Sequence, residues 1–141
     1  MTAIYTEKLK HFENVKNLGG KAWEHAKACD LIDGAGIDDC SLHCFHYQQM
    51  FELLFKHLLE TRSKYNAYPL IHKLDKLFSQ VVELTGFEGD VEKYNDTLNA
   101  LTVCAEAYRY NFLLNCETYQ RSIRVLNPLF DQLAEFSKVK I

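Results

Sequence analysis

Two cysteines and two histidines fall within seven positions of the segment DDCSLHCFHYQQM, residues 38–50. Structural zinc takes four tetrahedral ligands, and one helix can supply some of them at i, i+3 and i+4. Cys40, His43 and Cys44 have that spacing, whereas His46 would point about 120° away from Cys40 on a helix. The remaining ligands would have to come from elsewhere in the chain: Cys29, Cys104, Cys116 or His25. Cys40, His43 and Cys44 are therefore a second-choice metal site, and we expect neither a metal nor a cofactor.

The same cluster has two further interpretations. A catalytic thiol needs an exposed thiolate near a helix N-terminus with a base beside it, and Cys40 with His43 meets part of that requirement. No third group that would orient the histidine is evident in the sequence. Alternatively, Cys40 and Cys44 are small core residues, because cysteine is among the residue types most often buried.

A less conspicuous polar row follows on the same segment. Gln49, Glu52 and Lys56 are spaced at i, i+3 and i+7, so they share one face of a helix. Glu52 and Lys56 could be an ordinary i, i+4 ion pair on a solvated face, which contributes only a few tenths of a kcal/mol. The row could equally be part of a binding site.

The elements that would position these residues are helical. Only two prolines and six glycines occur in 141 residues, which favours long helices over many short strands. Apolar residues at helical spacing predict helices at about 3–17, 20–33, 39–63, 69–85, 90–110 and 115–138. The sequence NLGG at 17–20 predicts the end of the first helix, Pro69 the start of the fourth, and Pro128 a kink or split in the last.

Together these signals predict an all-α fold: one domain, residues 1–141, forming an antiparallel up-and-down bundle of four main helices with one or two short ones. Helix 39–63 has a wide apolar face with Phe45 and Leu53 outside it, which is typical of a central helix or of one that also faces a partner chain.

Charge and hydropathy exclude some classes of function. The net charge of −3 and the pI near 6.1 lack the basic footprint of a protein that binds extended nucleic acid. The N-terminus has no signal-peptide pattern, and no apolar run approaches the ~20 residues that span a bilayer. We therefore expect a cytoplasmic protein without membrane association, whose five cysteines are reduced.

The sequence HYQQMFELLFKHLLE, residues 46–60, resembles the motif of the HEPN-domain family of small helical bundles. In that family a Gln, a Glu three residues on and a Lys four beyond it precede paired apolar residues. A His-x-Leu and an Arg-Tyr pair follow later in the chain. The matching positions are Gln49, Glu52, Lys56, Leu58–Leu59, His72, Leu74, Leu77 and Arg109–Tyr110. Three positions depart from the pattern: Met50, Leu53 and Asn111.

The resemblance implies one of two functional groups. Some HEPN domains are ribonucleases, often toxins, with an Arg followed four to six residues later by a His. Here the last histidine is His72, and the preceding Arg62 is ten positions away, so that motif is absent. The resemblance therefore implies the other group, non-catalytic modules that bind a nucleotide-like or other small anionic ligand, or that serve a separate minimal nucleotidyltransferase as its substrate-binding partner.

On that interpretation we expect a homodimer whose ligand-binding residues are Gln49, Glu52, Lys56, His72, Arg109 and Tyr110. Lys56 and Arg109 would contact anionic groups, and Gln49 and His72 would hydrogen-bond. Glu52 would orient the cations, and Tyr110 would pack or stack. Two alternatives stay open. One is a ribonuclease with a rearranged catalytic pair, His72 and Arg109. The other is a structural dimer in which the polar row is only an ion-pair network.

Overall fold

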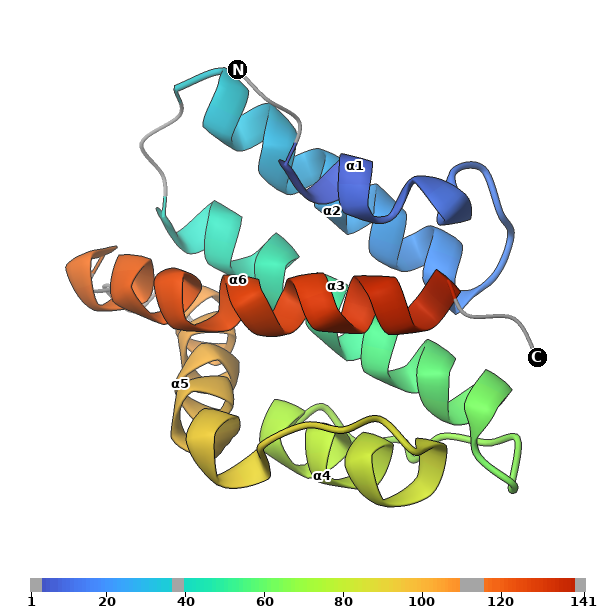
Figure 1. The fold of residues 1–141 in the computed structure, drawn as a ribbon. Helices are drawn as coiled ribbons and strands as arrows, with labels where there is room; N and C mark the ends of the chain where they lie inside the picture. Colours follow the sequence, from blue (N-terminus) through green and yellow to red (C-terminus); the bar gives the residue numbers. More distant parts are fainter. Residues whose placement is uncertain (1–3, 37–39, 110–115, 139–141) are drawn as a thin grey trace.

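The computed structural model describes residues 4–36, 40–109 and 116–138, except for the side chains of residues 107–109. The described residues form helices and no strand, which confirms the predicted all-α bundle (Figure 1). The elements in chain order are α1 (Ile4–Lys8), the short 3-10 helix η1 (Lys10–Phe12), α2 (Leu18–Gly34), α3 (Cys40–Arg62), α4 (Leu74–Thr85), α5 (Val91–Arg109) and α6 (Cys116–Lys138). No helix among these residues is long and apolar enough to cross a membrane.

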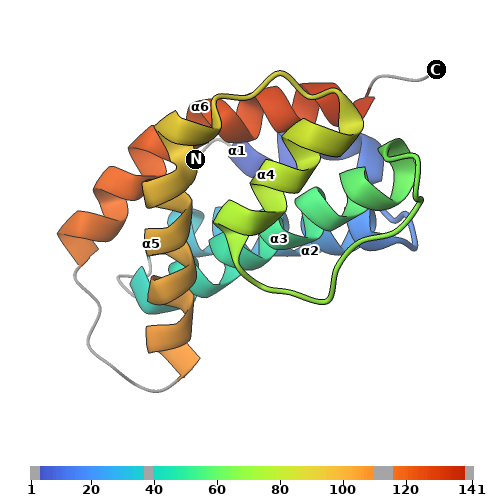
Figure 2. The same cartoon turned by 90° about the horizontal axis from the view of Figure 1, so that it is seen from below.

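Helix α3 is the central element. It packs against α2, α4, α5 and α6. Helices α2 and α3 lie side by side and run in opposite directions, while α6 crosses α3 from another layer (Figures 1 and 2). Because neighbours cover α3 on several sides, its polar face is buried along with its apolar one. Glu52 and Lys56 of the predicted polar row are therefore buried.

Aromatic side chains fill the core around α3. Phe55 of α3 stacks on Phe78 of α4 with ring centroids 5.7 Å apart, and Phe51 meets Phe130 of α6 edge-on at 5.9 Å. Each of these rings is almost wholly excluded from solvent. Full burial of a phenylalanine contributes about 1.5–3 kcal/mol, so these contacts are a main source of the attachment of α4 and α6 to α3.

The first predicted boundary is wrong. Residues 3–17 were expected to be one helix ending at the glycine pair, but the chain breaks earlier, and Asn14 adopts a left-handed φ of 60°. Asn17 instead begins α2, because its side chain accepts a hydrogen bond from the amide of Gly20 at 2.8 Å. The glycine is needed for close approach: a Cβ on Gly20 would lie 1.6 Å from the carbonyl oxygen of Val15.

Pro69 differs from expectation, and Pro128 differs only in part. Pro69 lies in the connection between α3 and α4 and does not start α4, which begins at Leu74, where the backbone amide donates to Oγ1 of Thr102 at 3.2 Å. Pro128 lies inside α6, which continues through it without the split that was one of the two predicted outcomes, and the helix changes direction along its length (Figure 2). The missing hydrogen bond would have used the carbonyl of Arg124, and because Arg124 and Pro128 are exposed, water can satisfy that oxygen.

Candidate functional site

The carboxylate of Glu52 is the centre of a buried polar cluster. On α3, Nε2 of Gln48 donates to Oε1 of Glu52 at 2.9 Å, and Nζ of Lys56 donates to Oε2 at 2.9 Å. From the α3–α4 connection, Nδ1 of His72 lies 2.8 Å from the same Oε2. We call these residues, Gln48, Glu52, Lys56 and His72, the Glu52 cluster. Of the predicted site residues, Lys56 from α3 and His72 from the α3–α4 connection therefore both bond to the carboxylate of Glu52.

Burial sets the electrostatics of the cluster. Glu52 and Lys56 are 4% and 6% exposed, so this is a buried ion pair rather than the solvated i, i+4 pair that the sequence also allowed. Burial by itself would raise the pKa of Glu52, but the hydrogen bonds from Gln48, His72 and Lys56 outweigh it, and the net pKa is lowered. The carboxylate is thus ionised at neutral pH and can only accept, so Nδ1 of His72 carries the proton.

His72 connects the cluster to solvent. Its side chain is 64% exposed, although its Nδ1 is held by a carboxylate that is only 5% exposed. A carboxylate on Nδ1 fixes the orientation of the ring, while most of the side chain lies in solvent. The arrangement can therefore present one oriented nitrogen to a ligand or to a reacting group.

Tyr68 is a second residue of the α3–α4 connection that contacts α3. The ammonium of Lys56 lies 5.7 Å from the centroid of the Tyr68 ring, within the range of a cation–π interaction. The Glu52–Lys56 pair therefore anchors the connection at both Tyr68 and His72. This anchoring role was not foreseen from the sequence.

The other predicted site residues, Gln49, Arg109 and Tyr110, are not seen in contact with the Glu52 carboxylate in the described part of the chain. Gln49 does not join the carboxylate directly: its Nε2 donates to Oε1 of Gln48 at 2.7 Å, one step removed from Glu52. The side chain of Arg109 and the whole of Tyr110 lie outside the described residues. The ligand contacts predicted for them, and the predicted pairing of Arg109 with His72, therefore stay predictions. Gln48 was missed, although its i, i+4 spacing to Glu52 could have indicated it.

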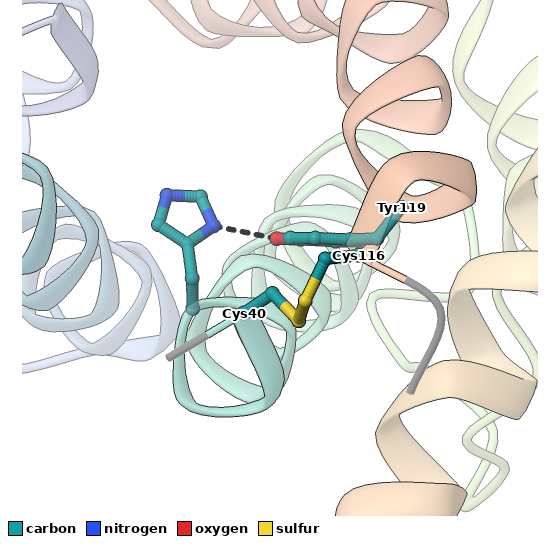
Figure 3. The surroundings of a disulfide bond; sticks show 4 residues. Cys40, Cys116 and Tyr119 are labelled. Carbon is teal, nitrogen blue, oxygen red and sulfur yellow. Dashed lines mark hydrogen bonds between the residues drawn. A yellow bond between two sulfur atoms is a disulfide. The ribbon is translucent and has the colours of Figure 1, made fainter. Parts of the chain in front are cut away.

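The second-choice metal site, Cys40, His43 and Cys44, does not converge on one point. Cys40 forms a disulfide with Cys116, and Nδ1 of His43 lies 2.5 Å from the hydroxyl of Tyr119 (Figure 3). The other ring nitrogen of His43 lies 3.3 Å from Oδ2 of Asp33. Because that carboxylate accepts the Nε2 proton, Nδ1 is left to accept from the Tyr119 hydroxyl.

These bonds hold the ends of three helices together. They join the first turn of α3 to the first turn of α6, and His43 adds the end of α2 through Asp33. Tyr119 is fully buried, and burial raises its pKa far above the usual value. Its hydroxyl is therefore protonated and out of reach of a substrate, which argues for a structural rather than a catalytic role.

The thiol of Cys44, the other cysteine at the start of α3, also has a partner. Cys44 is fully buried and shares a hydrogen bond with Cys104 of α5. That bond and burial raise the pKa of the donor Cys44, while accepting the bond lowers the pKa of Cys104. The described residues hold no group of three or more His, Cys, Asp or Glu side chains arranged for a metal ion. The expectation that all the cysteines are reduced is wrong for Cys40 and Cys116.

The hollows near the Glu52 cluster differ greatly in size. Beside His72, the depression that also involves Thr102 and Glu106 has about 10 Å³ of space, enough for one water molecule. On the Tyr68 side there is a cleft of about 650 Å³. We call it the Tyr68 cleft, and its walls are formed by Val15, Lys16, Asn17, Leu18, Gly20, Lys21, Glu24, Glu60 and Tyr68. A ligand larger than water fits the cleft and not the depression.

Comparisons with protein-family models, with curated proteins and with solved structures find no match to this chain.

Proposed function

We propose that this chain is a non-catalytic, HEPN-like binding module that holds a small anionic ligand, with the size and chemistry of a nucleotide, in the Tyr68 cleft. Size supports the proposal first. Small-molecule sites are typically about 300–1,000 Å³, and the cleft has about 650 Å³. The resemblance of the polar row to the HEPN motif supports a ligand of this kind.

The walls of the cleft match the parts of a nucleotide. Lys16 and Lys21 are exposed and lie on either side of the first residue of α2, where first-turn amides add positive potential for a phosphate. Glu24 and Glu60 are acceptors suited to ribose hydroxyls or to an exocyclic amine. Tyr68 offers a ring face for a base, a contact worth about 1–3 kcal/mol.

The single observation that carries the proposal is the contact between the Lys56 ammonium and the Tyr68 ring, 5.7 Å from its centroid. It links the buried Glu52 cluster to the wall of the cleft. His72 follows Tyr68 by four residues and is held by Glu52. The backbone on the C-terminal side of Tyr68 is therefore restrained as well. A binding ring whose position is fixed in advance loses less entropy when the ligand arrives.

This proposal changes the roles expected for the polar row. Lys56 is buried against Glu52, so it supports Tyr68 rather than contacting an anion itself. Glu52 orients Lys56, one of the two cations assigned to it, and also His72. Gln49 acts through Gln48. His72 does not line the cleft, and its role is to hold the connection that carries Tyr68.

Isothermal titration with AMP, ATP and inorganic phosphate tests this proposal. We expect wild-type protein to bind a nucleotide, and Tyr68→Leu and the double variant Lys16→Gln/Lys21→Gln to weaken binding by about tenfold, the equivalent of 1.4 kcal/mol. Lys93→Gln removes an exposed lysine from α5 and is the matched control. Wild-type affinity in the Tyr68 and lysine variants would exclude the cleft, and no binding by wild type would exclude the nucleotide class.

A protein partner is the second part of the proposal. Leu70 and Tyr65, on the same connection as Tyr68, have 88% and 63% of their surface exposed. Such apolar exposure suits contact with a separate minimal nucleotidyltransferase or with a second copy of the chain. Sedimentation of wild type and Leu70→Ser gives the oligomeric state. A monomer at all concentrations would contradict the homodimer.

One observation favours a catalytic alternative: a carboxylate holds Nδ1 of His72, as in many general bases. If the chain is a ribonuclease that uses His72 with Arg109, wild type cleaves RNA and His72→Ala does not. Intact RNA after prolonged incubation with wild type removes this alternative.

A further inference from the structure

Two histidines face each other across the interface of α2 and α3. Nδ1 of His25 lies 2.9 Å from Nδ1 of His46, and the ring centroids are 5.1 Å apart with an interplanar angle of 39°. The two side chains are half-buried and belong to antiparallel neighbouring helices. From the sequence, His46 was set aside because it points away from Cys40, and it is the fold that gives it a partner.

The distance between the nitrogens has a chemical meaning. Imidazole nitrogens bind first-row divalent ions at about 2.0–2.1 Å, so two such ligands at right angles lie about 2.9 Å apart. That is the separation between His25 and His46. Tetrahedral ligands are further apart, at about 3.3 Å for the same bond length. The spacing therefore suits ions that accept right-angled nitrogen ligands, which Cu²⁺ and Ni²⁺ do.

The ring of Phe45 packs against both histidines. Phe45 meets His25 edge-on at 6.2 Å and His46 edge-on at 5.2 Å. Burial and the neighbouring ring lower the pKa of His25, and burial also lowers the pKa of His46. Both rings are thus neutral at pH 7, the form that binds metals.

We propose that His25 and His46 form a two-histidine site for a borderline divalent ion, Ni²⁺ or Cu²⁺, whose other coordination positions stay open to water or an anionic group. The proton now shared between the two Nδ1 atoms moves to Nε2 of its own ring, so each histidine becomes the Nε2–H tautomer and presents a lone pair at Nδ1. No proton is released, because each neutral ring keeps one. Each ring has to turn slightly for the two lone pairs to meet at the ion, which partial exposure permits.

Ni²⁺ titration of the untagged protein tests the site, because Ni²⁺ does not oxidise the free cysteines. We expect wild type to bind one Ni²⁺ per chain, and His25→Gln and His46→Gln each to weaken binding by about tenfold or more. His11→Ala, which removes a histidine elsewhere on the surface, and Cys104→Ser, which removes a half-exposed thiol, should bind like wild type.

Two further readouts keep the test decisive if a variant folds poorly. Electron paramagnetic resonance of the Cu²⁺ complex should show coupling to two nitrogens in wild type. Ni²⁺ should raise the melting temperature of wild type but not of His46→Gln, since an ion stabilises only the state that binds it. Wild type that binds neither ion at millimolar concentration, or a His25→Gln/His46→Gln protein that binds as tightly as wild type, overturns the proposal and leaves the pair as a hydrogen bond.

Discussion

Nδ1 of His72 and Oε2 of Glu52 are 2.8 Å apart although the two residues are 20 positions apart in the chain. Glu52 lies deep in α3, whereas His72 is on an irregular connection with most of its ring in solvent. This bond, with the Lys56 ammonium beneath Tyr68, makes the buried ion pair an anchor for a surface segment. Stability and binding at the Tyr68 cleft should therefore depend on the same few groups.

Removal of one partner from the Glu52–Lys56 pair should cost more than removal of both. Lys56→Met leaves the Glu52 carboxylate buried without its cation, and loss of one member of a buried pair typically costs about 3–5 kcal/mol. In Glu52→Gln/Lys56→Met no charge remains, so we expect a smaller loss than for Lys56→Met. Urea denaturation of both variants and of Glu52→Gln gives the coupling energy. Additive losses would contradict the pairing.

Stability should fall as the solution is acidified from pH 6.5 towards pH 4, in part because of His57. Burial, with help from Arg62 and His11, lowers the pKa of His57 from 6.5 to about 4, and its Nδ1 has no hydrogen-bond partner among the described residues. The unfolded chain therefore binds a proton in this window that the folded chain does not, which costs up to about 3 kcal/mol at 1.36 kcal/mol for each pKa unit.

His57→Gln should flatten the pH dependence measured by denaturation between pH 6.5 and pH 4.5. The pKa values of His11, His25 and His46 are also lowered, so some slope should remain. Glu52, with a lowered pKa, loses its contribution only below its ordinary range near 4.5, outside this window. An unchanged slope in the variant would mean that His57 titrates normally in the folded protein.

The Cys40–Cys116 disulfide should stabilise the fold. It closes a loop with a sequence separation of 76, for which loop-closure entropy predicts about 4 kcal/mol. We expect a reducing agent to lower the denaturation midpoint of wild type and to leave that of Cys40→Ala/Cys116→Ala unchanged. Mass spectrometry after alkylation under native, non-reducing conditions should find these two cysteines unmodified. Modification of both would contradict the bond.

Asn127 should be required because it satisfies two tyrosines from different elements. Its Oδ1 accepts from the hydroxyl of Tyr5 at 3.1 Å and from that of Tyr47 at 2.7 Å. Asn127→Leu leaves both hydroxyls without this acceptor, at about 1–3 kcal/mol for each buried group. Adding Tyr5→Phe and Tyr47→Phe removes the orphaned hydroxyls, so the triple variant should recover part of the loss in thermal denaturation.

Local signals in the sequence located most helices but not all of their ends. Helix 39–63 was predicted within one residue at each end of Cys40–Arg62, since its periodicity is long and strong. The start of α4 was misplaced because Pro69 is a local signal, whereas the helix start depends on the amide of Leu74 reaching Thr102 of α5. Of the two outcomes predicted at Pro128, the split is absent for a similar reason: solvent at Arg124, a property of the packed helix, permits α6 to continue.

The sequence by itself determined the helical class, the central position of α3 and the candidate residues Glu52 and Lys56, because helical spacing and residue type are local properties, whereas His72 became a candidate only through the family resemblance. Only the tertiary structure decided what surrounds them. It buried the polar row by packing neighbours on several faces of α3, joined Cys40 to Cys116, and brought His25 opposite His46. These pairings join residues on different helices, and the spacing of residues along one helix does not specify which side chains of another helix will lie beside them.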